Sequence, residues 1–209
     1  FFGGWDGKSN FNDTWIFNQS KSDWKQINTI SSPSVRYSSA MASIGNSNKI
    51  ILFGGYDLTD FYEDTWMFEQ SKSDWVQIYT TSSPPARFSH EMASLGDSKE
   101  VVLFGGSTDE EVLGDTWVFD FNTTDWKEIK TNPNIPSPPA RYRYAMTSMG
   151  TTAVMYGGQD NNQAFLDDTW LFIKNPPING IHLESSNKWK WTQLSTQMAG
   201  RVMHSMATT

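Results

Sequence analysis

Several chemistries are excluded by what this sequence lacks. It has no cysteine, so disulfides, cysteine-ligated zinc and thiol nucleophiles cannot occur. No window approaches the run of about 18 apolar residues that a membrane-spanning helix requires, and we expect no membrane insertion. Basic residues number 16 against 23 acidic ones, for a net charge of -7. A nucleic-acid backbone partner needs a basic stripe, and we therefore expect no nucleic-acid binding.

The sequence is rich in glycine pairs and in tryptophan, and both recur at a fixed interval. The glycine pairs are spaced by 51, 51 and 52 residues, at Gly3-Gly4, Gly54-Gly55, Gly105-Gly106 and Gly157-Gly158. Asp-Thr-Trp triplets recur in the same phase, with tryptophans Trp15, Trp66, Trp117 and Trp170. A second tryptophan follows each triplet, at Trp24, Trp75, Trp126 and Trp191. An arginine then opens the next unit, at Arg36, Arg87, Arg141 and Arg201.

Each unit of this repeat can be divided into four β-strands. In the second unit they are predicted at residues 36–44, 49–53, 65–68 and 75–79. The second of these is a short apolar run bounded by turn residues, which is typical of a strand buried on both faces. The last two alternate polar and apolar residues, as half-buried strands do. No segment shows a helical period, so the sequence predicts an all-β fold.

A four-stranded sheet of this size cannot bury both of its faces alone, whereas stacking neighbouring sheets face to face can. The double glycines, the aromatic about ten residues later and the second tryptophan resemble the kelch repeat, whose period is about 50 residues. The resemblance covers essentially the whole chain. It implies a kelch-type β-propeller of four-stranded antiparallel blades, with both tryptophans packed between adjacent blades. The Ser-Pro-Pro-Ala-Arg segments and the tryptophan-rich, cysteine-free composition are similar to those of kelch arrays in secreted or surface proteins of prokaryotes. This resemblance implies an extracellular or cell-surface location, with the cytoplasm as the alternative.

The four repeats are expected to form one array over residues 1–209. Repeat 1 spans 1–35, with 201–209 as a candidate closing strand, and the others span 36–86, 87–140 and 141–200. Three assemblies remain open: a four-blade ring, part of a larger ring, and self-association of two chains through open propeller edges.

The candidate binding residues lie in the loops between the second and third strands, which vary most in chemistry. Aromatic rings beside hydrogen-bonding groups suit a peptide or a glycan. The predicted binding residues are Trp5, Asp6, Phe11, Tyr56, Asp57, Asp60, Phe61, Tyr62, Asp109, Glu110, Asp160 and Asn161. An insertion of twelve residues between Trp170 and Trp191 is either a further binding loop or a tolerated surface insertion.

The recurring residues are expected to be structural. The arginines would hold backbone carbonyls or a carboxylate at the blade junctions, and the aspartate of each triplet would serve as a turn and cap residue. His90 and His204 occupy equivalent positions in different repeats, and no metal site or Ser-His-Asp triad is predicted. We therefore expect a non-catalytic binding or scaffolding module for a protein or glycan, with no metal and no cofactor. The alternatives are an enzyme with its site at the propeller centre and a structural element of an extracellular assembly.

Overall fold

A computed structural model describes residues 1–130, 134–174 and 189–195. All regular elements in these ranges are β-strands, which form four successive antiparallel sheets. Sheet 1 contains β1 (Phe2–Trp5), β2 (Asn10–Asn18) and β3 (Asp23–Ile27). Sheet 2 contains β4 (Ala40–Ser43), β5 (Lys49–Phe53), β6 (Thr65–Glu69) and β7 (Asp74–Ile78). Sheet 3 contains β8 (Glu91–Ser94), β9 (Glu100–Phe104), β10 (Thr116–Asp120) and β11 (Asp125–Glu128). Sheet 4 contains β12 (Ala145–Met149), β13 (Thr152–Tyr156), β14 (Thr169–Lys174) and β15 (Trp189–Leu194).

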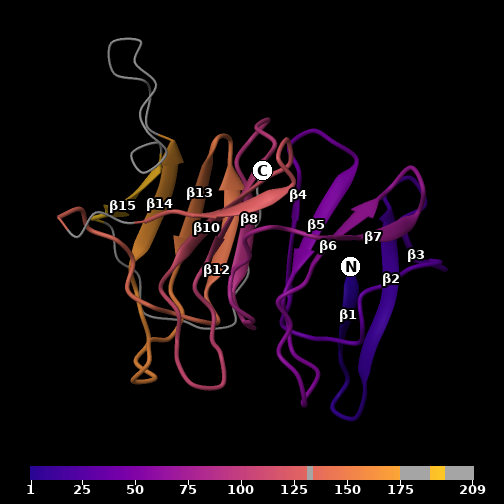
Figure 1. The fold of residues 1–209 in the computed structure, drawn as a ribbon, viewed down its shortest axis with the longest axis horizontal. Coiled ribbons are helices and arrows are strands. Elements are labelled where there is room, and N and C mark those ends of the chain that lie inside the picture. Colours follow the sequence, from indigo (N-terminus) through magenta and orange to yellow (C-terminus); the bar gives the residue numbers. More distant parts are fainter. Residues whose placement is uncertain (131–133, 175–188, 196–209) are drawn as a thin grey trace.

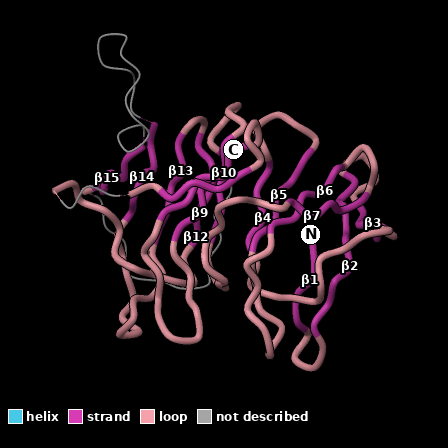
Figure 2. The backbone as a smooth tube through the Cα atoms, viewed as in Figure 1, coloured by secondary structure: helices cyan, strands magenta, loops and turns pink. Residues whose placement is uncertain are grey.

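The sheets follow one another in sequence order across the molecule. Sheet 1 (indigo) and sheet 4 (orange) lie at opposite sides, with sheets 2 and 3 between them (Figure 1). The connections between the second and third strands of all four repeats project from one edge, the lower one in this view (Figures 1 and 2). The predicted all-β array of propeller blades is confirmed. No helix among the described residues is long and apolar enough to cross a membrane.

The first strand of sheet 2 is shorter than predicted. In sheet 2 it begins at Ala40 rather than at Arg36. Ser38 has a φ of 54°, which interrupts an extended strand, and Tyr37 forms only an isolated bridge to Tyr56. The predicted repeat boundaries remain predictions, and residues 201–209, including Arg201, lie outside the described residues.

In repeats 2, 3 and 4, the second glycine of the pair lies at close range to the first segment of its own repeat. Gly106 has a φ of 95°, and a Cβ atom there would lie 2.7 Å from the Cβ of His90 and 2.8 Å from the carbonyl oxygen of Phe88. Both the positive φ and the lack of space favour glycine. The pair therefore ends the buried strand where the backbones of neighbouring segments meet.

The second tryptophan of a unit packs against the preceding sheet. Trp126 is 2% exposed, stacks edge-on against Phe53 and donates its indole N–H to the Thr65 hydroxyl at 2.9 Å. The same arrangement joins sheets 1 and 2 through Trp75 and sheets 3 and 4 through Trp191. Trp24 departs from the prediction that both tryptophans lie between blades, because no sheet precedes sheet 1 among the described residues.

Arg36, Arg87 and Arg141 are fully buried, and each links three segments of its blade. Arg87 donates to the carbonyl oxygens of Pro85 and Gly105 and forms a two-pronged ion pair with Asp115. Asp115 also accepts the indole N–H of Trp117. Arg36 and Arg141 make the corresponding contacts. The interpretation of this aspartate as a turn and cap residue was incomplete, since its carboxylate neutralises the buried guanidinium.

Candidate functional site

Five aromatic side chains form a continuous row across sheets 1, 2 and 3. Successive ring centroids along the row lie 4.5–5.8 Å apart. We call this the aromatic row; its members are Trp5, Tyr37, Tyr56, Phe61 and Phe88. Trp5 is 51% exposed and the other four are half-buried, so the row presents ring surface to solvent.

Backbone pairing outside the sheets places these rings side by side. Tyr37, just after the repeat arginine, bridges Tyr56, just after the double glycine. Tyr56 in turn bridges Phe61 in its own loop. The equivalent positions of sheet 3 carry Ser107 and Val112, so the run of aromatic bridges stops there.

A pocket of about 510 Å³ lies beside the row, and all four repeats contribute to it. We call it the central pocket; it is lined by Trp5, Tyr37, Ser38, Ser39, Phe88, Ser89, His90, Glu91, Arg143 and Tyr144. The inner segments are joined by backbone hydrogen bonds, from Ser89 N–H to Ser38 O at 2.9 Å and from Arg143 N–H to Ser89 O at 3.1 Å. Each of these three residues has a φ of 54°, which side-chain-bearing residues rarely adopt. The fixed backbone therefore positions the pocket side chains.

Two opposite charges enter the central pocket where other repeats carry small neutral residues. Glu91 occupies the position of Ala40 and Ala145, and Arg143 occupies that of Ser38 and Ser89. Burial raises the pKa of the Glu91 carboxyl to about 7. Arg143 is exposed, with its guanidinium 5.3 Å from the centre of the Tyr142 ring. The pocket thus offers an acid that titrates near neutrality and an accessible cation.

His90 and Tyr144 form the wall of the pocket and contact the preceding sheet. Tyr144 donates its hydroxyl to the carbonyl oxygen of Phe104 and accepts the Glu91 backbone N–H at 3.1 Å. The His90 ring packs edge-on against Phe53 and is 2% exposed. Burial, assisted by the charge of Arg87, lowers the pKa of His90 to about 3, so this ring is neutral. A buried neutral histidine in this place is a packing residue.

The structure divides the predicted binding residues of sheets 1 and 2 into two groups. Trp5, Tyr56 and Phe61 belong to the aromatic row, and Phe11 is 38% exposed at the start of β2. The polar members mainly shape their own loops. The Asp57 carboxylate accepts hydrogen bonds from the Tyr62 hydroxyl, the Asp60 N–H and the Thr59 N–H and hydroxyl. Burial alone would raise the Asp57 pKa, but these hydrogen bonds outweigh it and lower the pKa.

Tyr62, Asp6 and Asp160 also serve loop geometry. The Arg36 guanidinium carbon lies 4.0 Å above the centre of the Tyr62 ring. Tyr62 is half-buried and donates its hydroxyl to Asp57. Backbone N–H groups of Ser9 and Lys8 donate to Asp6 and lower its pKa. The residues of sheets 3 and 4 stand apart from the central pocket; they are Asp109, Glu110, Asp160 and Asn161. Among the described residues, no three acidic or histidine side chains are grouped as metal ligands.

Sequence reasoning missed most of the central pocket. Tyr37 and Phe88 directly follow repeat arginines and Arg143 lies two residues after one, in segments that were assigned to a first strand. The signal was the break in the repeat pattern at Glu91 and Arg143, since charged residues replace alanine and serine there. The insertion predicted as a candidate loop falls mainly on 175–188, outside the described residues.

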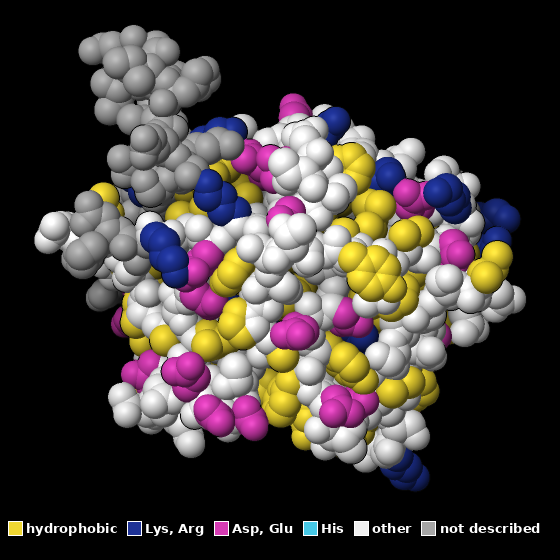
Figure 3. All heavy atoms as spheres, viewed as in Figure 1, with side chains coloured by type: hydrophobic (Ala, Val, Ile, Leu, Met, Phe, Trp, Pro, Cys, Tyr) yellow, Lys and Arg dark blue, Asp and Glu magenta, His cyan; other side chains and the backbone are white. Residues whose placement is uncertain are grey.

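Charges of both signs are interspersed on the face shown in Figure 3. Lysine and arginine lie among acidic side chains, and apolar side chains form separate patches between polar atoms.

Comparison with known proteins identifies the repeat. The family model described as the KLHDC2/KLHL20/DRC7 Kelch-repeats domain matches residues 1–99 and 80–209. F-box/kelch-repeat protein At1g51550 of Arabidopsis thaliana is 28% identical over 93% of this chain and 41% of its own length. Kelch domain-containing protein 10 of Xenopus laevis is 28% identical over 92% of this chain and 45% of its own length. The tRNA wybutosine-synthesizing protein 4 of Aspergillus fumigatus is 26% identical over 72% of this chain and 14% of its own length.

The chain therefore spans less than half the length of these relatives. The matched model covers the whole sequence in two overlapping segments, in agreement with the four repeated sheets. This chain belongs to the kelch-repeat family.

Proposed function

We propose that this chain is a non-catalytic protein-binding module that holds an extended peptide segment of its partner against the aromatic row and the central pocket. Membership in the kelch-repeat family indicates a protein-interaction module. The observation that carries the proposal is the row of five contacting aromatic rings beside a pocket formed by four repeats.

The aromatic row suits a partner side chain with apolar or planar surface. Trp5 and Tyr37 stack with an interplanar angle of 27° and lie at the rim of the pocket. Rigid aromatic side chains supply large contact area with little loss of conformational entropy, and they are enriched among residues that dominate binding energy. A peptide crossing the row would place one end at the rim of the central pocket.

The central pocket supplies polar recognition. The hydroxyls of Ser38, Ser39 and Ser89 and the charges of Glu91 and Arg143 converge there from separate repeats. Polar groups at fixed places in a pocket set the orientation and specificity of its ligand.

A peptide selection on the purified chain, followed by calorimetric titration of the selected peptides, tests this proposal. Trp5→Ala and Phe61→Ala should each weaken peptide affinity by about tenfold or more. Tyr79→Ala is the matched control, because Tyr79 is 84% exposed outside the row and the pocket, and it should leave affinity unchanged. Equal affinity of all variants contradicts the proposal, and so does a glycan array on which sugars bind through the same residues while no peptide does.

A further inference from the structure

The central pocket contains one carboxylate to which no described side chain bonds. Glu91 is the first residue of β8 and is half-buried in the lining of the pocket. Its backbone N–H donates to the Tyr144 hydroxyl, but within the described ranges its carboxylate has no hydrogen bond or ion pair, and burial alone shifts its pKa. A carboxylate withdrawn from water without a partner is unfavourable, so a ligand that pairs with it gains affinity.

The segments packed against Glu91 bring no cation to it. β4 and β12, which contact β8, contain no charged residue. β9 pairs with β8 and places Phe104 opposite Glu91. Burial keeps the two neighbouring titratable groups neutral, since it lowers the pKa of His90 to about 3 and raises that of Tyr144 well above its ordinary value.

The arginines closest to Glu91 in the sequence are engaged elsewhere. Arg87, four residues before it, forms its ion pair with Asp115. Arg143 lines the same pocket, but it is exposed and its guanidinium lies over the Tyr142 ring, outside the lining. The Glu91 carboxylate is therefore available to a positive charge supplied by a ligand.

Aromatic rings surround the same pocket. Trp5, Tyr37 and Phe88 of the aromatic row all belong to its lining. The faces of aromatic rings attract a cation within about 6 Å. Lysine and arginine side chains combine a positive charge with an apolar stem, which suits a carboxylate beside aromatic rings. The pocket volume of about 510 Å³ lies within the range of about 300–1,000 Å³ that is usual for ligand pockets.

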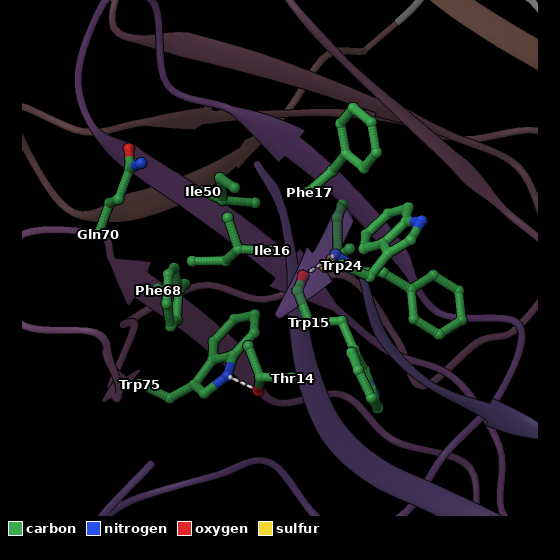
Figure 4. Close-up of a pocket in the computed structure, with 11 residues that line it drawn as sticks. Thr14, Trp15, Ile16, Phe17, Trp24, Ile50, Phe68, Gln70 and Trp75 are labelled. Carbon is green, nitrogen blue, oxygen red and sulfur yellow. Dashed lines mark hydrogen bonds between the residues drawn. The ribbon is translucent and has the colours of Figure 1, made fainter. Parts of the chain in front are cut away.

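A second pocket, of about 290 Å³ between sheets 1 and 2, lacks this chemistry. None of the side chains labelled in Figure 4, which line it, carries a charge. Figure 4 also shows the Trp75 indole turned toward Thr14, to which it donates a hydrogen bond. This pocket belongs to the packing between two sheets and offers no partner for a charged group of a ligand.

We propose that Glu91 is a specificity-determining residue of the central pocket, where its carboxylate pairs with a lysine or arginine side chain of the bound peptide. The inference rests on the proposed function, because it names the chemistry of the side chain that enters the pocket. Ala40 and Ala145 begin the corresponding strands of sheets 2 and 4, so blade packing does not require an acid at this position. The carboxylate gives one repeat a preference for charge that the others lack.

Parallel selections from a random peptide library displayed on phage, on the unmodified chain and on Glu91→Gln, test the proposal. Peptides selected on the unmodified chain should share a lysine or arginine at one position, and those selected on Glu91→Gln should not. Glu111→Gln is the matched control, because Glu111 is exposed in the same repeat and does not line the pocket. It should select the same peptides as the unmodified chain.

Calorimetric titration then measures the contribution of the charge pair. Replacing the shared basic residue of a selected peptide by methionine should weaken binding to the unmodified chain by about tenfold or more, and binding to Glu91→Gln by about twofold at most. Affinity of the unmodified chain for a lysine peptide should rise by up to about tenfold between pH 6 and pH 8, because the Glu91 pKa is about 7 and lysine stays charged. The Glu91→Gln profile should be flat.

Glu91→Ala is a second variant, since alanine stands at this position in two other sheets, and it should lose the preference in the same way. Peptides that bind through Trp5 and Phe61 without a shared basic residue would overturn this inference and leave the proposed function standing. An equal loss on methionine substitution in the unmodified chain and in Glu91→Gln would also overturn it. Failure to select any peptide would overturn both proposals.

Discussion

Replacing Asp115 by asparagine should expose how strongly the buried arginines stabilise each blade. The Arg87 side chain is fully buried, and Asp115 supplies its charge partner through contacts of 2.6 and 2.7 Å. Asparagine keeps the shape but removes the negative charge, and its amide nitrogen cannot accept a guanidinium N–H. Breaking a buried ion pair by removing one partner costs about 3–5 kcal/mol. Because the Asp115 side chain is 22% exposed, we expect the lower end of that range, about 3 kcal/mol.

The matched variant is Asp168→Asn in sheet 4. Its partner Arg141 is equally buried, but the Asp168 side chain is 11% exposed, so the loss should be at least as large. Urea denaturation followed by far-ultraviolet circular dichroism gives both changes in unfolding free energy. A loss below about 1 kcal/mol in both variants would refute the reasoning, because that is the size expected of an exposed ion pair.

The Arg87–Asp115 pair should also make the free energy of unfolding fall at acid pH. Burial alone would raise the Asp115 pKa, but the hydrogen bonds and charge of Arg87 outweigh it, so the folded pKa lies below the ordinary value. This contribution is therefore present above that value and is lost as the pH falls through the lower, folded pKa. Asp115→Asn should flatten the acid limb relative to the unmodified chain.

Three further predictions follow from single contacts. Gly106→Ala should destabilise the fold far more than Gly7→Ala. Both glycines have a φ of 95°, but only at Gly106 would the new Cβ meet other atoms. Equal shifts of the melting temperature in the two variants would contradict this. Thr65→Val should cost about 1–3 kcal/mol by leaving the buried Trp126 indole N–H unpaired, whereas Thr169→Val should cost little; similar urea midpoints for both would count against the junction described. Glu91 has a folded pKa of about 7, so its stabilising effect is complete below the ordinary value of 4.5 and is lost as the pH rises through about 7. This loss of unfolding free energy is at most about 3 kcal/mol, and Glu91→Gln should abolish it. If the pH profile of urea denaturation is the same for Glu91→Gln and the unmodified chain, the carboxyl is solvated and the reasoning is wrong.

The sequence predicted the blade array because its recurring residues have one physical role in every unit. The double glycines, the triplets and the second tryptophans recur in phase, and each marks a position where neighbouring segments touch. Trp126 and Gly105 show this directly: Trp126 bonds to Thr65 of the preceding repeat, and a Cβ atom at Gly105 would lie 2.6 Å from the Arg141 carbonyl oxygen of the next one. Such contacts constrain residue identity strongly enough to be read without coordinates.

The inner strand and the triplet aspartate were less accessible to sequence reasoning. Alternation of residue types cannot reveal that Ser38 adopts a positive φ, so the first strand was predicted to start too early. Asp115 lies 28 residues from Arg87, and only the folded blade shows that the two side chains meet. An aspartate before a strand has the same local appearance whether it caps a turn or neutralises a buried cation.

The candidate site depends on contacts between segments that lie far apart in the sequence, within and between repeats, and these fix where a loop side chain points. Trp5, Tyr56 and Phe61 were predicted because exposed aromatics stand out in polar loops. Tyr37 and Phe88 complete the row only because their backbones bridge the residues after the double glycines. The predicted carboxylates largely hold their own loops together, which sequence alone could not distinguish from ligand binding.

Hydrogen exchange of the indole N–H groups, followed by NMR at low protein concentration, tests the stacking of the sheets most directly. The indoles of Trp75, Trp126 and Trp191 are buried and bonded to threonine hydroxyls, so they should exchange slowly. The Trp24 indole is half exposed and should exchange as fast as that of a free tryptophan side chain. Equally fast exchange at all four positions would contradict the account that tryptophans seal the junctions between blades.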